Sequence, residues 1–351
     1  MADTSIIPAD EAQLAEAIRA ADGPLSLTGG GTRGMAPEGR ILSLEGLTGI
    51  VDYVPAALTL IAKAGTPLAE VNAALAQERQ RLAFEPPDWR AALETTGDPT
   101  IGGIVAANLS GPRAVTAATP RDHLLGLRFV DGGGTVVKSG GRVMKNVTGL
   151  DLARLVCGSR GRLGAITEVA LKVLPMPEAT ATLAAHGLDA QQAVTAMSAA
   201  LATPWEVTGA ARTPDGTTYL RIEGFAESVA YRQERLLAHL GKGWEISESD
   251  PWPGIRDIRG LGQGELWLLR CRPSDAAGLV VRAGAERSLM DLGGARLVLA
   301  VAPGTDLRAS LPGVPAVRVG RPDAAPESPG VARLSAGLKA RFDPRGLFGD
   351  H

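Results

Sequence analysis

Three glycine-rich segments in the first half of the chain have the composition expected of an anion-binding site. They are Gly29-Gly30-Gly31-Thr32-Arg33-Gly34, Thr96-Gly97-Asp98-Pro99-Thr100-Ile101-Gly102-Gly103 and Gly158-Ser159-Arg160-Gly161-Arg162-Leu163-Gly164. Backbone without side chains lets consecutive N–H groups converge on a phosphate and lets a planar ring approach closely. Each segment alone could also be a tight turn without a ligand. Together they predict one long, phosphate-containing ligand that lies along the backbone.

The first segment also satisfies the G-x-G-x-x-G pattern of dinucleotide-binding βαβ folds, and Asp52 follows at a distance that suits a ribose-binding acid. That fold needs a helix that begins inside the motif, because the helix N-terminus binds the pyrophosphate. Here Pro37, Gly39 and an extended run follow instead, so we reject a βαβ dinucleotide fold. A further glycine cluster, Asp131–Gly134, separates two strand-like runs and predicts a hairpin turn.

The elements that must position these segments are short and mixed. Asp10 is expected to start the first helix, and Thr66 is expected to cap a helix that has Pro67 at its first position. Pro175 and Pro177 suggest a boundary, which predicts domains at 1–177 and 178–328 and a C-terminal helical segment at 329–351. The other expected helices are 100–108, 151–157, 189–201, 229–240, 276–286 and 331–342, and the expected strands are 24–27, 40–44, 49–54, 58–63, 125–130, 135–138, 165–174, 205–212, 217–222, 265–270 and 296–301.

Composition narrows the class of protein. The chain has 351 residues, 45% hydrophobic and 21% charged, with a formal net charge of −2, so bulk charge does not point to nucleic acid or an anionic membrane. Cys157 and Cys271 stand alone, which excludes thiolate ligation of an iron–sulfur cluster or structural zinc and favours free thiols over a disulfide. Without a secretory leader or a membrane-spanning apolar run, the chain is expected to be cytoplasmic.

In order and spacing, the glycine segments resemble the FAD-binding domain of the vanillyl-alcohol oxidase type, also called the PCMH type. The resemblance covers about residues 1–177 and includes Gly149-Leu150-Asp151-Leu152 and Gly164-Ala165-Ile166-Thr167; the end of the chain, Leu338–Pro344, is similar to the family's closing segment. Within that family the chain resembles the FAD-binding E subunits of glycolate oxidases, through Gly111-Pro112-Arg113, Arg121–Gly126 and Val143–Gly149. Leu150, Arg162 and Leu347-Phe348-Gly349 depart from the family's usual residues.

The resemblance implies an α+β fold, with a PCMH-type domain of two α+β subdomains, a smaller α+β cap domain and a C-terminal helix. It also implies non-covalent FAD. The first glycine loop would bind the pyrophosphate, the second segment would line the pyrophosphate and flavin, and the third would touch the adenosine half. The residues expected to bind the cofactor are Gly29, Gly30, Gly31, Thr32, Arg33, Gly34, Thr96, Gly97, Thr100, Ile101, Gly102, Gly103, Ala106, Asn108, Gly158, Gly161, Gly164 and Ile166.

A 2-hydroxy-acid oxidase also needs a base for the hydroxyl proton and a cation for the carboxylate. Lys145, Arg113 and His123 are the candidates for catalysis, beside the other cations Arg33, Arg121 and Arg142. Each also has a structural interpretation, as a phosphate partner, a solvated loop cation or a buried histidine. Related dehydrogenases carry a histidine-bearing metal segment in the second domain, and nothing similar lies between residues 178 and 330.

The leading hypothesis from the sequence is therefore an FAD-binding subunit of a glycolate (2-hydroxy-acid) dehydrogenase complex. A homologous flavin subunit and an iron–sulfur subunit are the expected partners, and the complex could associate peripherally with a membrane. Two alternatives are open: a non-catalytic flavin-fold subunit whose sister does the chemistry, and a stand-alone FAD-dependent reductase of the same fold. They differ in whether this chain's own flavin is reduced, and by what.

Overall fold

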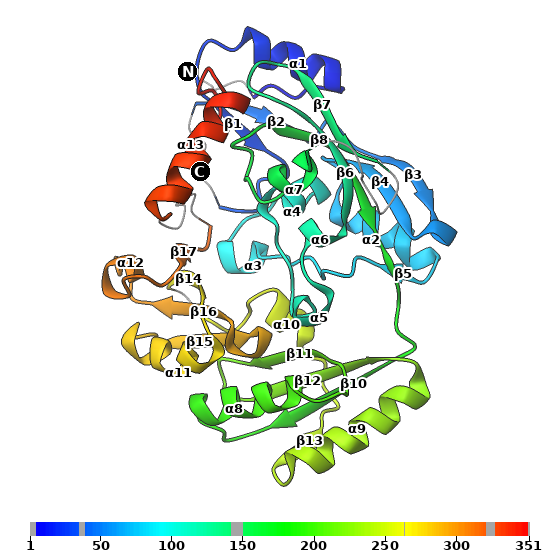
Figure 1. The fold of residues 1–351 in the computed structure, drawn as a ribbon, viewed down its shortest axis with the longest axis vertical. Coiled ribbons are helices and arrows are strands. Elements are labelled where there is room, and N and C mark those ends of the chain that lie inside the picture. Colours follow the sequence, from blue (N-terminus) through cyan, green and yellow to red (C-terminus); the bar gives the residue numbers. More distant parts are fainter. Residues whose placement is uncertain (1–4, 35–38, 142–149, 263, 321–326, 350–351) are drawn as a thin grey trace.

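The computed structural model describes residues 5–34, 39–141, 150–262, 264–320 and 327–349. Figure 1 shows two parts, an upper one from the first half of the chain and a lower one from the second, each built on its own larger sheet. The last helix, α13 (Pro329–Phe342), lies beside the upper part, where Leu338 and Phe342 pack against its core. The predicted α+β class is confirmed.

The upper part is organised around a five-stranded antiparallel sheet. Its central strand, β8 (Ala165–Lys172), has six buried residues out of eight, as expected of an apolar strand covered on both faces. Phe129, Leu60 and Val71 belong to the core around it. In sheet order the strands are β3 (Ile50–Val54), β4 (Thr59–Lys63), β8, β6 (Leu124–Val130) and β7 (Val136–Gly140).

Short helices and connections complete the upper part. A small parallel pair, β1 (Leu25–Thr28) and β2 (Arg40–Ser43), packs with α1 (Glu11–Ala20) into a separate core that the C-terminal Phe348 joins. The remaining elements are η1 (Pro55–Ala57), α2 (Leu68–Gln77), α3 (Arg90–Leu93), α4 (Ile101–Ala107), α5 (Ala114–Ala117), α6 (Pro120–His123), α7 (Leu152–Val156) and the paired strands β5 (Gln80–Arg81) and β9 (Leu174–Pro175).

The lower part is built on an eight-stranded antiparallel sheet. Its order is β13 (Trp244–Ile246), β10 (Ala179–Ala185), β12 (Thr218–Gly224), β11 (Val207–Arg212), β15 (Arg287–Asp291), β16 (Arg296–Val301), β14 (Glu265–Arg270) and β17 (Ala316–Arg318). One face forms a core with α8 (Ala190–Leu201), α9 (Ala226–Leu240) and α11 (Pro273–Arg282). The other face packs against α10 (Trp252–Arg256) and against Trp89 of the upper part. Two short turns, η2 (Leu292–Gly294) and α12 (Leu307–Ser310), complete it.

Most expected elements form, and the exceptions have local causes. The hairpin is confirmed, since Asp131 Oδ1 accepts hydrogen bonds from the N–H groups of Gly133 and Thr135, at 2.9 and 2.8 Å. The cap expected at Thr66 is wrong: its hydroxyl donates to the carbonyl of Lys63 at 2.7 Å, and α2 begins after Pro67. The elements that were not predicted include strands β10, β13, β15 and β17, helix α10 and the short elements β5, α3, α5, α6 and α12.

The predicted boundary at residue 177 falls between β9 and β10. Described strands before it and after it join different sheets. The division into domains stays a prediction, because packing of Trp89 into the lower core ties the two parts together.

Candidate functional site

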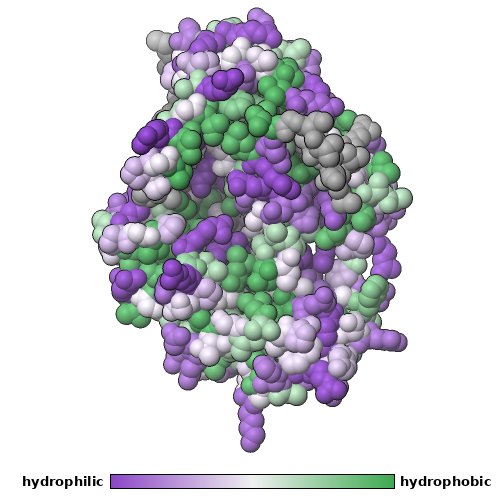
Figure 2. Space-filling model, in the orientation of Figure 1, coloured by the Kyte–Doolittle hydropathy of each residue, from purple (hydrophilic) through white to green (hydrophobic). Residues whose placement is uncertain are grey.

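The three glycine-rich segments meet at one cavity of about 380 Å³, between the upper part and strands β14 and β17. The surface in Figure 2 is hollowed at this level, and both hydrophobic (green) and hydrophilic (purple) residues border the hollow. Of the residues predicted to bind the cofactor, those in the cavity wall are Gly29, Gly30, Gly31, Thr32, Arg33, Thr100, Gly102, Gly103, Ala106, Asn108, Gly161, Gly164 and Ile166.

The first glycine loop follows β1 and fits tightly against the second segment. A Cβ on Gly30 would lie 1.7 Å from the carbonyl oxygen of Asp98, and one on Gly97 would lie 1.5 Å from the carbonyl oxygen of Gly30. Glycine is therefore required on both sides of this contact. Gly97 supports the loop from behind and is not in the wall, while Gly31, with a φ of +65° and nothing within 4 Å of a Cβ, faces open space.

Helix α4 presents its small residues to the cavity. Thr100 caps the helix, because its Oγ1 accepts a hydrogen bond from the N–H of Gly103 at 3.2 Å. Gly102 lies against Ala64, whose Cβ would be 2.5 Å from an added Cβ, so the helix packs closely on the sheet. Asn108 ends the helix in the left-handed region, with a φ of 49°.

Five predicted cofactor residues lie outside the wall. Ile101 belongs to the upper core, and Thr96 is exposed. A Cβ on Gly158 would lie 2.9 Å from Arg121 Nη2, and Gly34 lies near Leu93 and Gly320. With Gly97, these residues shape the loops without facing the cavity, and their contact with a cofactor stays a prediction.

The opposite wall comes from the second half of the chain. Leu268 and Arg270 on β14 and Val317 on β17 line it, together with Pro315. Leu268 pairs with Val317 across the antiparallel strands, so both side chains emerge on the same face. Sequence analysis found none of these residues, because β17 was not predicted and β14 carries no glycine or motif.

The cavity is positively charged. Among its described lining residues are Arg33, Arg160, Arg270 and Arg318, and no aspartate or glutamate. The Arg318 guanidinium lies over the Trp267 ring, at 5.1 Å, and pairs with Glu265. Burial, followed by the charge of Arg160, lowers the pKa of Arg33 to about 10. Burial also lowers the pKa of Arg160 and of Arg270, with smaller contributions from neighbouring arginines.

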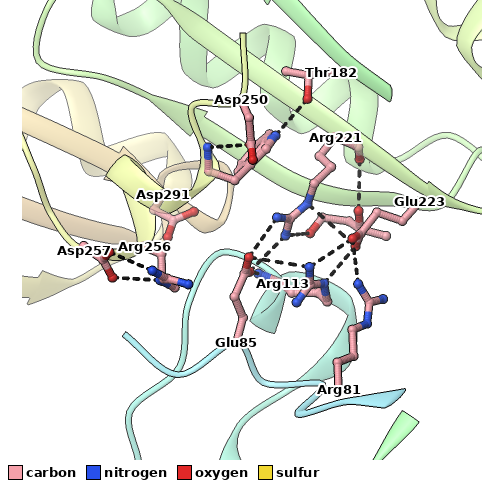
Figure 3. A network of polar contacts seen from close by, with 12 residues as sticks. Arg81, Glu85, Arg113, Thr182, Arg221, Glu223, Asp250, Arg256, Asp257 and Asp291 are labelled. Carbon is pink, nitrogen blue, oxygen red and sulfur yellow. Dashed lines mark hydrogen bonds and ion pairs between the residues drawn. The ribbon is translucent and has the colours of Figure 1, made fainter. Parts of the chain in front are cut away.

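Arg113, predicted as catalytic, lies in a buried ion-pair network that joins the two parts of the molecule (Figure 3). Its Nε donates to Glu223 Oε2 at 2.8 Å, and its backbone N–H donates to Glu85 Oε2 at 2.9 Å. Arg221 donates two hydrogen bonds of 3.0 Å to Glu85, and Arg81 donates to Glu223 at 2.7 Å. Arg113 is not in the cavity wall, and a catalytic role for it stays a prediction.

The network contains two carboxylates and three arginines. Burial alone would raise the pKa of Glu223, but the hydrogen bond from Arg113 and the charges of Arg221, Arg113 and Arg81 outweigh it and lower the pKa to about 2. Because Glu85 and Arg113 come from the upper part and Glu223 from β12, the network fixes the lower sheet beneath the cavity.

Of the two other predicted catalytic residues, the structure describes only His123. His123 is buried, with Nε2 2.6 Å from the carbonyl oxygen of Ala117, and its Nδ1 has no partner among the described residues. Its ring packs 5.9 Å from the ring of Phe84. Lys145 and Arg142 lie outside the described residues. Both roles stay predictions.

Comparisons with known proteins agree with this geometry. A family model described as an FAD binding domain matches residues 2–140. The glycolate oxidase subunit GlcE of Escherichia coli (strain K12) is 34% identical over 337 residues, which is 93% of this chain and 91% of that protein. The subunit GlcD of Bacillus subtilis (strain 168) is 39% identical over 102 residues, 29% of this chain and 21% of GlcD.

The fold is also that of a solved structure. An alkyldihydroxyacetonephosphate synthase superposes with a TM-score of 0.71 over 97% of this chain and 76% of the synthase, at 14% identity, so this likeness concerns the fold alone. Within the described ranges, no helix is both long and apolar enough to cross a membrane.

Proposed function

This chain belongs to the FAD-binding family of the glycolate oxidase subunit GlcE, and on that premise we propose that the cavity described above binds FAD for the oxidation of a 2-hydroxy acid. One observation carries the proposal. Three glycine-rich segments that lie far apart in the sequence, at residues 29–34, 96–103 and 158–164, supply backbone to a single cavity.

The residues present suit the cofactor. Gly31 leaves open space where a side chain would otherwise enter, Gly103 lines the cavity, and the buried Nη1 of Arg33 lacks a partner among the described residues. An anion would satisfy that guanidinium, and an apolar ring system suits the wall formed by Leu268, Val317 and Ala106. FAD, when bound, would supply the acceptor for the two electrons released from the carbon that bears the hydroxyl group.

Non-covalent binding is part of the proposal. His123, the histidine that the sequence placed nearest the flavin, is buried with its Nε2 on the carbonyl oxygen of Ala117. Its side chain therefore belongs to the support of the upper part and not to the cavity wall.

We assign the substrate's carboxylate to Arg270. This guanidinium lines the cavity from β14, opposite the glycine segments, and no hydrogen bond or ion pair joins it to another described side chain. A carboxylate is the planar anion that a guanidinium binds with two parallel hydrogen bonds. Arg270 would orient the acid, while Leu268 and Val317 exclude water from the same wall.

The electrons must then leave the chain. Cys157 is buried and Cys271 partly buried, and they are separate free thiols, so they cannot ligate a cluster together. No group of metal-ligating side chains is present among the described residues. We therefore propose a complex with a homologous flavin subunit and an iron–sulfur subunit, associated with a membrane only through that complex.

A second candidate is a flavin-binding subunit without turnover of its own. It is favoured by the described cavity wall, which contains arginines but no His, Lys, Asp or Glu that could act as a base. In that case FAD stabilises the subunit and a sister subunit oxidises the substrate.

Anaerobic mixing of the FAD-loaded chain with glycolate or D-lactate distinguishes the two candidates. The oxidising role predicts bleaching of the flavin absorbance within the turnover time of the purified complex, and about 10-fold or greater weakening of substrate binding in Arg270→Met. Flavin that stays oxidised in this chain alone, while substrate reduces flavin in the intact complex through the sister subunit, would contradict the oxidising role and support the second candidate. Arg272→Met, an exposed neighbour outside the cavity, is the control.

A further inference from the structure

Two arginines, Arg33 and Arg160, line the same cavity although they carry the same charge. Arg33 ends the first glycine loop, and Arg160 lies in the loop between α7 and β8. Both line the cavity, and the charge of Arg160 contributes to the lowered pKa of Arg33. Two like charges have therefore been brought together from positions more than a hundred residues apart in the sequence, which costs free energy unless an anion lies between them.

The described surroundings do not neutralise this pair. Nη1 of Arg33 is inaccessible to solvent and makes no hydrogen bond, and the guanidinium lies 5.6 Å from the centre of the Trp89 ring. Asp88 is the acid whose charge acts on Arg33, but both its carboxylate oxygens already accept hydrogen bonds from Arg90, at 2.8 to 3.1 Å. No side chain pairs with the Arg160 guanidinium among the described residues, where its charged neighbour is Arg162.

The two positive charges of this pair indicate how many negative charges the bound anion carries. Two guanidinium groups suit a ligand with two negative charges a short distance apart, and each guanidinium can bind phosphate oxygens in a bidentate manner. The diphosphate of FAD has one charge on each of its two phosphates. Gly31 lies two residues before Arg33, and Gly161 follows Arg160. Both glycines line the cavity, so the diphosphate has room to approach the backbone beside each arginine.

We propose that Arg33 and Arg160 form a two-arginine clamp that binds the diphosphate of FAD, one guanidinium to each phosphate. The clamp rests on the proposed function, because it assigns these side chains to a cofactor that the family binds. It adds to that function two charged side chains that bind the diphosphate. Without the diphosphate, their guanidinium groups would repel each other.

The clamp makes opposite predictions for the free and the loaded protein. Removing one of two repelling cations should leave the melting temperature of the FAD-free chain unchanged or raise it. The same change should weaken FAD binding, because a charge-assisted hydrogen bond to phosphate is lost. A residue with a purely structural role would lower the melting temperature in both forms.

The experiment compares the wild-type chain with Arg33→Met, Arg160→Met and the double variant, each freed of flavin and titrated by calorimetry with FAD, ADP and riboflavin. Each single variant should weaken FAD and ADP binding by about 10- to 100-fold and leave riboflavin, which has no phosphate, unaffected. Raising the salt concentration should weaken FAD binding more in the wild type than in the double variant. Arg33→Lys, which keeps the charge, should recover part of the affinity.

Arg154→Met is the matched control, since Arg154 is an exposed arginine on α7 whose side chain pairs with Asp151 away from the cavity. FAD affinity within twofold of the wild type in both single variants would overturn the clamp, as would equal weakening of riboflavin and FAD. Failure of the wild-type chain itself to bind FAD would instead overturn the proposed function, so the two failures are distinguishable.

Discussion

Gly102 and Gly103, neighbours on α4, have different roles: one is needed for folding and the other leaves room for binding. Gly102 lies against Ala64, where an added Cβ would come 2.5 Å from the alanine Cβ. Gly103 lines the cavity, and an added Cβ would come near only the Thr100 hydroxyl, at 3.2 Å. The first glycine is required for packing of the helix on the sheet, and the second leaves room for a ligand.

Gly103→Leu should therefore fill part of the cavity without disturbing the core. We expect FAD affinity to fall by at least about 10-fold, while the melting temperature of the FAD-free chain changes little, because Leu has a higher helix propensity than Gly. Titration with FAD and a thermal melt measure the two effects.

Gly278→Leu is the control, since Gly278 is exposed on α11 and a Cβ there meets nothing within 4 Å. Unchanged FAD affinity in Gly103→Leu would mean that the flavin does not occupy this part of the cavity.

At the scale of single residues, the sequence predicts which backbone segments line the cavity better than it predicts which side chains do. The glycine segments were found because glycine itself carries the signal, and thirteen of the eighteen residues predicted to contact the cofactor lie in the wall. Arg160 was part of a quoted motif but was not selected. Arg113 and His123 were proposed as catalytic residues, and the structure shows Arg113 in the ion-pair network and His123 buried with Nε2 on the carbonyl oxygen of Ala117.

At the scale of elements, the buried network couples β12 to β5 and α5. Glu223 on β12 accepts hydrogen bonds from Arg113 and Arg81, and Arg221 on the same strand pairs with Glu85. Such a pair is costly to break, because the partner that stays behind keeps a buried charge. The network therefore sets the position of the lower sheet relative to the glycine segments.

Glu223→Gln should lower the free energy of unfolding at pH 7 by about 3 kcal/mol. The folded pKa of Glu223 is about 2, below its ordinary value of 4.5, so its stabilising effect is complete above about pH 5 and is lost as pH falls towards 2. The difference between wild type and variant, measured by urea unfolding, should accordingly shrink over that pH range.

Glu245→Gln serves as the comparison, because the Glu245 side chain is largely exposed and pairs with His186 at the surface. A wild-type advantage over Glu223→Gln that stays constant from pH 7 to pH 3 would show that the ionised carboxylate is not the stabilising group.

The elements also show where sequence patterns stop being informative. Strands β6, β8, β11 and β12 were predicted because apolar runs are bounded by Gly, Asp or Pro. Strand β10 is rich in alanine and threonine, and β17 has three residues, so neither carries a strong periodic signal. Both form through pairing with neighbours that lie far away in the sequence.

At the scale of the whole molecule, the cavity exists because the two parts close on each other. Trp89 of the upper part enters the lower core, and Arg296 of β16 donates to the carbonyl oxygen of Ser110 in the upper part. Leu268 and Arg270 reach the glycine segments only through this packing. A sequence pattern cannot show such a wall, since its residues are brought together by tertiary structure alone.

The central claim is that one FAD lies in this cavity, and calorimetric titration of the purified, flavin-free wild-type chain with FAD tests it most directly. The account predicts saturation at one FAD per chain and visible flavin absorbance that stays with the protein after gel filtration. A chain that releases no heat on titration and elutes without flavin absorbance would contradict it.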